Sequence, residues 1–371
     1  YWQVRQWLTG FTGSVGTIVV TQDFAGLWVD GRYWVQAEQQ LKHTGYVLQK
    51  QSHDPASTHL AWLSQHLAKD AKISVNGQNI SVQHFAALAD IATNQQFKIE
   101  TDLDLINKIW HDRPALPRNS VWQMADHLNA LTRVEKITEI RDALNLKNAT
   151  AHFVSSVDDI AWISNCRGSD VEYNPVFLAH LYISLDRAVL FIDDAKLADH
   201  LQAKFKADQI EILAYEQSAD FLKQIHNQTI LIDPAKVSVL HAQAIELHNQ
   251  LIQDINPSSL LKSRKHPSEI AHIRNAMIKD GVALCHFFHW LDTALKNGES
   301  INELTIDEKA TAFRKQQQGF IDLSFSTIAG FNANGALPHY RATADNFSQI
   351  TGNGLLLIDS GAQYADGTTD I

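Results

Sequence analysis

Residues 355–371, Leu-Leu-Leu-Ile-Asp-Ser-Gly-Ala-Gln-Tyr-Ala-Asp-Gly-Thr-Thr-Asp-Ile, decide how the rest of the sequence is interpreted. The apolar run 355–358 predicts a short buried strand, and Asp359 ends it. Asp366-Gly367 is a turn signal, and residues 368–371 resume a strand-like composition. A hairpin folded at this turn would bring Asp359 and Asp370 roughly opposite one another.

Two unpaired carboxylates forced together would cost several kcal/mol or take up a proton. One divalent metal ion, or a pair of them, would remove that penalty. The alternative is one aspartate at a strand end and one in a turn, unrelated and solvated. The spacing alone favours this alternative, so the residues around the pair have to decide.

Those residues carry a family resemblance. The segments 358–364 and 366–371 resemble the paired-aspartate segment of the Xaa-Pro aminopeptidases (aminopeptidase P), which are pita-bread, or creatinase-fold, metallopeptidases like prolidase and methionine aminopeptidase. Upstream, residues 327–340 (Thr-Ile-Ala-Gly-Phe-Asn-Ala-Asn-Gly-Ala-Leu-Pro-His-Tyr) resemble the segment that carries the family's active-site histidine, here His339. The resemblance implies that Asp359 and Asp370 bind two divalent metal ions, usually manganese, and that His339 is catalytic.

The activity implied by the resemblance is hydrolysis of the N-terminal Xaa-Pro bond of peptides by a metal-bound hydroxide. This bond has no N–H group, so peptidases that hydrogen-bond the amide fit it poorly. His339 would donate a hydrogen bond to the developing oxyanion or shuttle a proton. Two alternatives stay open: a prolidase-like enzyme that cuts only Xaa-Pro dipeptides, and a catalytically inactive pita-bread protein that binds peptides.

The order of strands and helices predicts an α/β (α+β) protein of three domains. The family resemblance implies that two creatinase/prolidase N-terminal-like α/β domains, 1–117 and 118–260, precede the first half of a pita-bread domain, 261–371. The segments 28–34 and 156–177 resemble the first and second domains of the family. The expected strands are 15–21, 25–29, 45–50, 72–75, 151–154, 181–185, 188–192, 210–213 and 229–232. The expected helices are 33–41, 58–68, 82–92, 134–146 and 158–166.

In the last domain a helix is expected from Pro267 and a second over 305–317, and a strand over 320–328 leads into the His339 loop. Three histidines of the first helix, His272, His286 and His289, could share a metal. The neighbouring Phe287, Phe288 and Trp290 favour an aromatic core face instead. Arg32 in the first domain could touch a ligand, but a structural arginine in a turn is favoured.

Composition excludes several classes of partner. A net charge of −10 argues against nucleic acid, whose phosphates need basic surfaces. No apolar stretch approaches the roughly 20 residues that span a bilayer. Cys166 and Cys285 are too few for a disulfide framework, so they are interpreted as small buried hydrophobic residues of a cytoplasmic protein. The family resemblance further implies a homodimer and peptide substrates with proline at position two.

The family's metal site also uses a histidine and two glutamates from later strands, at positions beyond 371. We therefore expect the sequence to be part of a longer polypeptide, and this part alone to be inactive.

Overall fold

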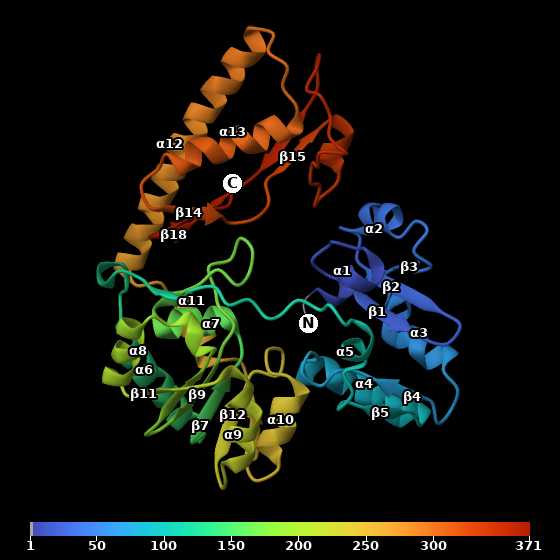
Figure 1. The fold of residues 1–371 in the computed structure, drawn as a ribbon, viewed down its shortest axis with the longest axis vertical. Coiled ribbons are helices and arrows are strands. Elements are labelled where there is room, and N and C mark those ends of the chain that lie inside the picture. Colours follow the sequence, from blue (N-terminus) through green and yellow to red (C-terminus); the bar gives the residue numbers. More distant parts are fainter. Residues whose placement is uncertain (1–2) are drawn as a thin grey trace.

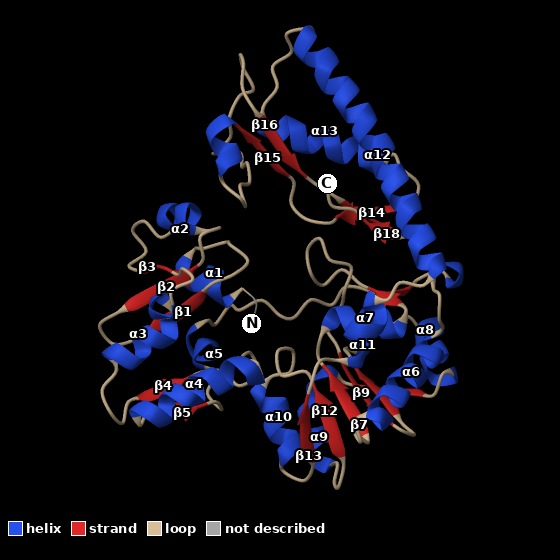
Figure 2. Ribbon diagram, turned by 180° about the vertical axis from the view of Figure 1, so that it is seen from behind, coloured by secondary structure: helices blue, strands red, loops and turns tan. Residues whose placement is uncertain are grey.

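Three consecutive blocks of mixed helix and strand make up the chain, as the sequence predicts (Figure 1). The structure, a computed structural model, describes residues 3–371. The first block, in blue, and the second, in green to yellow, lie next to each other (Figures 1 and 2). The third, in orange to red, lies above the second in these views, and its β15–β16 end is directed toward the first.

The first block contains two small sheets. In one, β2 pairs with β1 antiparallel and with β3 parallel; in the other, β4 and β5 are parallel. Phe11, Leu27 and Tyr33 form the centre of its core and are almost fully buried. Its elements are α1 (Val4–Thr9), β1 (Thr17–Val20), β2 (Ala25–Val29), α2 (Trp34–Gln40), β3 (Val47–Lys50), η1 (Pro55–Ser57), α3 (His59–His66), β4 (Lys72–Ser74), α4 (Val82–Gln95), β5 (Lys98–Glu100) and α5 (Leu105–Ile109).

The second block has a six-stranded mixed sheet in the order β11-β10-β9-β7-β12-β13 and a two-stranded antiparallel sheet of β6 and β8. Its main sheet therefore differs from the small sheets of the first block. Its elements are β6 (Trp122–Gln123), η2 (Asp126–Leu128), α6 (Arg133–Leu146), β7 (Ala151–Val154), α7 (Val157–Ser164), β8 (Cys166–Arg167), β9 (His180–Ser184), β10 (Ala188–Phe191), η3 (Asp194–Lys196), α8 (Asp199–Ala207), β11 (Ile210–Leu213), η4 (Tyr215–Gln217), α9 (Ser218–Gln224), β12 (Thr229–Ile232), α10 (Val239–Glu246), β13 (Gln250–Gln253) and α11 (Pro257–Ser263).

Each face of this sheet has its own buried core, because its central strands are apolar on both sides. One core contains Ile140 of α6, Ile160 of α7 and Phe205 of α8. The other contains Leu222 of α9 and Ile245 of α10. Helices therefore cover both faces (Figure 2).

Two long helices and two small sheets form the third block. Its elements are α12 (Pro267–Lys296), α13 (Glu303–Lys315), β14 (Phe320–Leu323), β15 (Ile328–Phe331), η5 (Asn332–Ala336), β16 (Leu356–Asp359), β17 (Ala362–Tyr364) and β18 (Gly367–Thr368). The sheets are β14-β17-β18 and β15-β16, all antiparallel. Phe287, Ile306 and Ala329 are buried at the centre of its core.

The single strand predicted over 320–328 is wrong. The chain leaves the first sheet after Leu323 and enters the second at Ile328, where it pairs with a different strand. Ser324 at the switch donates its backbone N–H to Gly361 and its hydroxyl to the Thr369 carbonyl. These bonds satisfy the backbone at the break, so the two strands can separate.

The aromatic core face predicted for α12 is only partly right. The buried row of this helix includes Ala276, Ala283 and Phe287, whereas Phe288 is 53% exposed. His286 and His289 also lie on the exposed side. Cys285 is exposed as well, so its interpretation as a buried residue is wrong, while Cys166 is buried as expected.

Backbone hydrogen bonds join the first block to the second. The segment 77–83 exchanges such bonds with 234–240: the N–H groups of Val82 and Val239 donate to Val237 and Ile80, both at 3.0 Å. These paired bonds resemble the edge of a sheet and fix the orientation of the two blocks relative to each other.

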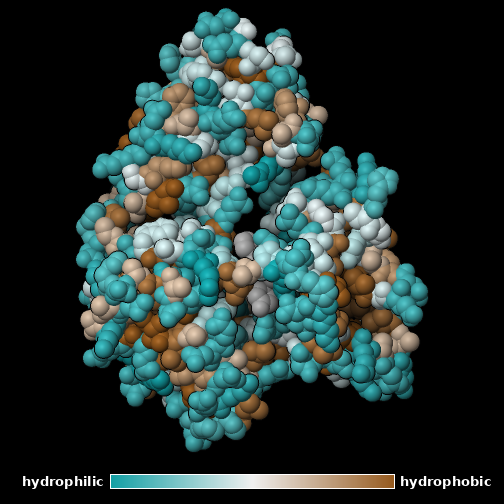
Figure 3. Space-filling view, in the orientation of Figure 1, coloured by the Kyte–Doolittle hydropathy of each residue, from teal (hydrophilic) through white to brown (hydrophobic). Residues whose placement is uncertain are grey.

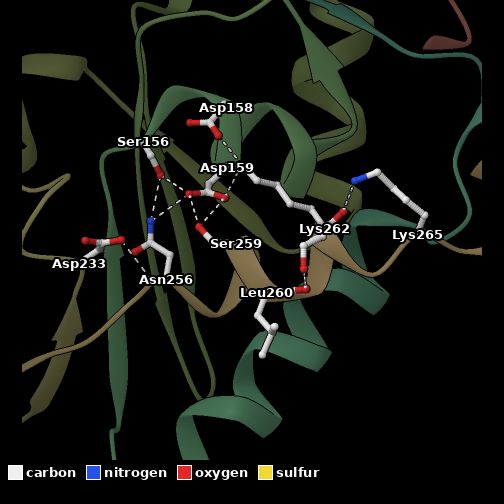
Figure 4. Close-up of polar contacts among 10 residues, drawn as sticks. Ser156, Asp158, Asp159, Asp233, Asn256, Ser259, Leu260, Lys262 and Lys265 are labelled. Carbon is white, nitrogen blue, oxygen red and sulfur yellow. Dashed lines mark hydrogen bonds and ion pairs between the residues drawn. The ribbon is translucent and has the colours of Figure 1, made fainter. Parts of the chain in front are cut away.

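A buried carboxylate ties the second block to the helix before the third (Figure 4). Asp159 of α7 accepts hydrogen bonds from Ser156 and from Asn256, the latter at 2.9 Å, and forms an ion pair of 2.8 Å with Lys262 of α11. The acidic start of α7 is therefore structural, and it holds α11 where α12 begins.

The surface is mostly hydrophilic on the face shown in Figure 3, with apolar patches between the polar ones. Within residues 3–371, no helix is long and apolar enough to cross a membrane.

Candidate active site

His339 lies in the loop between η5 and β16, and a buried glutamate holds that loop. Glu303, the first residue of α13, accepts hydrogen bonds from the backbone N–H groups of Phe331 and Ser348, each at 2.7 Å. It also accepts from the hydroxyl of Tyr340 at 2.7 Å and from the Asn334 amide at 3.0 Å. The backbone on both sides of His339 is therefore fastened to one side chain.

Asp359 and Asp370 lie at the end of β16 and just after β18. The predicted hairpin forms: Tyr364 pairs with Gly367, and Ser360 and Ile371 exchange backbone hydrogen bonds of 2.9 and 3.0 Å. In this register Asp359 and Asp370 are diagonal neighbours, not directly opposite each other. The residue across from Asp370 is Gly361.

Gly361 is required because the hairpin is tightly packed there. A Cβ atom at this position would lie 2.0 Å from the Thr369 carbonyl oxygen and 2.3 Å from the Ser324 hydroxyl. Any side chain would push the two strands apart next to the aspartates.

The three predicted site residues share one electrostatic environment. Burial and the nearby charge of Asp370 raise the pKa of Asp359, and the nearby imidazole of His339 opposes that shift. Like charges this close favour a proton or a cation between them. The fold thus brings together residues that are separated in the sequence.

The donor set suits hard divalent cations, since carboxylate oxygens are the ligands these ions prefer. Burial and the charge of Asp370 both raise the pKa of Asp359, and a bound cation would oppose both effects. Within residues 3–371 no group of three or more His, Cys, Asp or Glu side chains is arranged to hold a metal ion. His272, His286 and His289 therefore do not form a metal site, and the assignment of Asp359 and Asp370 as metal ligands stays a prediction.

The third block anchors the hairpin through α12. Asp366 at the turn accepts a hydrogen bond of 2.7 Å from Asn275 and pairs with Lys279 at 2.5 Å. On the adjacent strand, the hydroxyl of Tyr364 donates to Asp280 at 3.0 Å. The segment that carries Asp370 is thus bonded to two successive turns of one helix.

No local sequence pattern indicates that the first block reaches His339. The Tyr33 hydroxyl lies 3.3 Å from His339 Nδ1, and the two rings are 4.9 Å apart. Arg32, which precedes Tyr33 in the chain, forms the expected structural contact in a turn: its guanidinium pairs with Asp30 at 2.8 Å. The hydrogen bond from Arg32 is the main cause that lowers the pKa of Asp30 to about 2. A separation of 306 residues hides the Tyr33–His339 contact from any local pattern.

The second block reaches the same region. The Tyr173 hydroxyl accepts a 3.2 Å hydrogen bond from Arg341, two residues after His339. The Tyr173 carbonyl accepts a 3.0 Å bond from Gln363 on β17. Both preceding blocks therefore touch the segments that carry the site residues.

Family models match almost the whole chain. The Creatinase/Prolidase N-terminal domain matches residues 3–104 and, in a second form, 112–269, and Metallopeptidase family M24 matches residues 271–371. "Xaa-Pro aminopeptidase 1" of Dictyostelium discoideum is 35% identical over 99% of this chain and 60% of its own length. "Xaa-Pro aminopeptidase ApepP" of Drosophila melanogaster is 33% identical with the same coverage.

A solved structure has the same fold along nearly all of the chain. The X-prolyl aminopeptidase of Caenorhabditis elegans, described as a cytosolic enzyme with a di-nuclear active site, superposes with a TM-score of 0.92 at 28% identity. The match covers 98% of this chain and 61% of that one, so the chain spans about three fifths of the relatives' length. From its two creatinase/prolidase N-terminal domains and the metallopeptidase domain that follows them, the chain belongs to metallopeptidase family M24, in the three-domain arrangement of the Xaa-Pro aminopeptidases.

Proposed function

We propose that this chain belongs to a metalloaminopeptidase that removes the N-terminal residue of peptides whose second residue is proline. The observation that carries the proposal is the shared environment of Asp359, Asp370 and His339 in a chain whose named relatives are Xaa-Pro aminopeptidases. Relatives of that name match 99% of the chain, which supports this activity over the dipeptidase alternative. Retention of all three residues argues against an inactive peptide-binding module.

Asp359 and Asp370 would supply two of the ligands for a pair of divalent metal ions, for which we propose manganese because the ligands are carboxylates. Bound there, the metals would act as Lewis acids and activate water. Asp359, at the end of β16, and Asp370, just after β18, are diagonal neighbours, an arrangement that would let both carboxylates face one site.

His339 would bind the substrate carbonyl and not the metal. An imidazole N–H can donate a hydrogen bond to the oxygen that gains negative charge as the peptide bond is attacked. A donor of this kind does not depend on the substrate amide N–H, which an Xaa-Pro bond lacks. The Glu303 contacts keep the loop in place while this charge develops.

The proposal also covers the location of the protein, its oligomeric state and its domain boundaries. We propose a cytoplasmic homodimer; the description of the Caenorhabditis elegans enzyme as cytosolic supports the location. The division into domains at about residues 117 and 260 also remains a prediction. Each of the first two domains contributes a tyrosine, Tyr33 or Tyr173, to the surroundings of the site.

The test is release of the N-terminal residue from an Arg-Pro-Pro peptide by the full-length protein, with manganese titrated into metal-free enzyme. An Arg-Pro dipeptide and an Arg-Ala-Pro peptide serve as controls for length and for the proline requirement. Manganese-dependent cleavage of Arg-Pro-Pro alone is expected. Cleavage of the dipeptide only would favour the prolidase alternative, and binding of Arg-Pro-Pro without cleavage would favour the peptide-binding module.

The site assignment has its own control. His339→Ala should lower turnover far more than metal content, because its proposed contact is with the transition state. Equal loss of metal and turnover would make His339 a ligand or a structural support instead.

A further inference from the structure

We infer that Tyr33 of the first domain is a positioning residue that fixes the orientation and the tautomer of His339. The inference rests on the role proposed above for His339. It gives the first domain a specific task in the reaction that none of the comparisons assigns to it.

Tyr33 is held rigidly where it meets His339. Tyr33 is only 2% exposed, and its ring packs edge-to-face on the ring of Phe11, with the centroids 5.7 Å apart. The Arg32 guanidinium lies over the ring at 5.5 Å. A Cβ atom on Gly13 would lie 2.9 Å from the Tyr33 ring, so this glycine leaves the room that the ring needs. A ring confined on several sides loses little entropy when its hydroxyl makes a bond.

The hydroxyl of Tyr33 connects Ser14 to His339. Its oxygen lies 2.6 Å from Ser14 Oγ and 3.3 Å from His339 Nδ1. A phenol has a single proton to donate. When Ser14 donates to the Tyr33 oxygen, the Tyr33 proton goes to Nδ1, and the imidazole proton must then reside on Nε2.

That tautomer is the one the proposed reaction needs. Because Nδ1 faces Tyr33, Nε2 is the ring nitrogen left to face the substrate. Protonated at Nε2, the neutral imidazole can donate to a developing oxyanion; protonated at Nδ1, it cannot. With Ser14 as the donor to its oxygen, Tyr33 holds His339 in the donor form without contacting the substrate.

The position of the first domain is fixed well enough to carry this task. Residues 77–83 are joined to 234–240 of the second domain by backbone hydrogen bonds, and Tyr173 joins the second domain to Arg341 and Gln363. Tyr33 therefore approaches His339 from a framework that is bonded to the catalytic domain by a second route.

The test uses Tyr33→Phe in the full-length protein, because phenylalanine keeps the ring packing and removes only the hydroxyl. We expect kcat on Arg-Pro-Pro to fall about fivefold, the rate equivalent of one neutral hydrogen bond, with KM little changed. Tyr46→Phe is the matched control: it makes the same change in a residue packed on the same core, away from His339. An unchanged kcat in Tyr33→Phe, or an equal loss in Tyr46→Phe, would overturn the inference.

A double-mutant cycle separates action through His339 from a general structural effect. In the His339→Gln background, Tyr33→Phe should have no further effect on kcat. Additive losses would show that Tyr33 acts independently of His339 and would refute the inference. If His339→Gln alone leaves kcat unchanged, the role proposed for His339 fails instead.

A readout independent of activity completes the test. In protein labelled with ¹⁵N-histidine, the His339 resonances are assigned by their loss in His339→Gln. Nδ1 should resonate as an unprotonated, hydrogen-bonded nitrogen, and this resonance should shift in Tyr33→Phe and not in Tyr46→Phe. A protonated Nδ1, or a resonance that Tyr33→Phe leaves in place, would overturn the inference even if the protein cleaves no peptide.

Discussion

Glu303 accepts a 2.7 Å hydrogen bond from the hydroxyl of Tyr340, the residue that follows His339. The same carboxylate accepts the backbone N–H groups of Phe331 and Ser348, which stand on either side of the His339 loop. Glu303 is fully buried, yet these hydrogen bonds outweigh the effect of burial and lower its pKa. One ionised side chain thus closes the loop at both ends.

Replacing Glu303 by glutamine should loosen this loop. The new NH₂ group would face groups that are themselves donors, and an unsatisfied buried donor costs about 1–3 kcal/mol. We expect the free energy of unfolding, measured with urea, to fall by that amount. An unchanged urea midpoint in Glu303→Gln would contradict this account.

The effect should also depend on pH. Since folding lowers the pKa of Glu303, its ionised form stabilises the folded state above the ordinary glutamate pKa. That stabilisation is lost as the pH falls through the lower, folded-state value. The difference between wild type and Glu303→Gln should therefore be largest at neutral pH and shrink in acid.

Breaking the buried ion pair of the third domain should be more costly. Arg314 and Asp280 are both fully buried and form two hydrogen bonds of 2.8 and 3.0 Å. Arg314→Met leaves the Asp280 charge buried and unpaired, a change that typically costs about 3–5 kcal/mol. Tyr364→Phe removes one hydrogen bond to Asp280 and should cost about 1 kcal/mol.

A double variant provides the control for this pair. Arg314→Met combined with Asp280→Leu removes both charges, so it should be more stable than Arg314→Met alone. If the double variant is the less stable of the two by urea denaturation, the loss in Arg314→Met does not come from an unpaired charge.

Removing one site carboxylate should have opposite effects with and without metal. Asp370→Asn relieves the repulsion that helps raise the pKa of Asp359. Because Asp370 is exposed, the gain in stability of the metal-free protein should be below about 1 kcal/mol. Manganese should raise the Tm of wild type by mass action and should raise that of Asp370→Asn much less. Equal manganese-induced shifts in Tm would show that Asp370 is not a ligand.

Local sequence patterns predicted those strands and turns that depend mainly on residues close to them in the sequence. The strands 25–29, 151–154, 210–213 and 229–232 are found as predicted, because short apolar runs bounded by turn residues have few alternatives. The Asp366-Gly367 turn likewise forms the predicted hairpin. The break between β14 and β15 was missed because it depends on bonds from Ser324 to residues that follow it by about forty positions.

The candidate site residues could be predicted from the sequence only where they lie in short motifs. Asp359, Asp370 and His339 were predicted from two segments that lie within 45 residues of one another, and in the structure Asp370 and His339 both act on the pKa of Asp359. Tyr33, Tyr173 and Glu303 were missed, because each acts through a tertiary contact that periodicity does not encode. For Tyr33 the only signal was its place in the segment 28–34, which marked the first domain and not the site. Cys285 was misjudged because an average burial preference says nothing about which side of α12 it occupies.

The last prediction concerns three buried histidines of the second domain. Burial lowers the pKa of His152 and of His241 to about 4, and lowers that of His180 well below its usual value. His180 and His241 are neighbours, with ring centroids 4.6 Å apart. Each is neutral in the folded domain and takes up a proton on unfolding in mild acid.

Acid should therefore destabilise this domain well above the pH at which carboxylates titrate. Between pH 6.5 and 4 the unfolded state binds more protons, so stability falls as the pH is lowered, by about 1.4 kcal/mol per pH unit for each such histidine.

His241 bonds two serine hydroxyls, Ser218 at 3.0 Å and Ser238 at 2.8 Å, which a glutamine amide can also bond. His241→Gln should keep stability at pH 7 near that of wild type and lose less of it at pH 5. His200→Gln, the same change on the exposed first turn of α8, is the control and should not alter the slope. The measurement is the free energy of unfolding in urea at pH 7, 6 and 5. If this free energy changes equally with pH in wild type and in His241→Gln, the folded domain tolerates a charge on His241 and its acid sensitivity arises elsewhere.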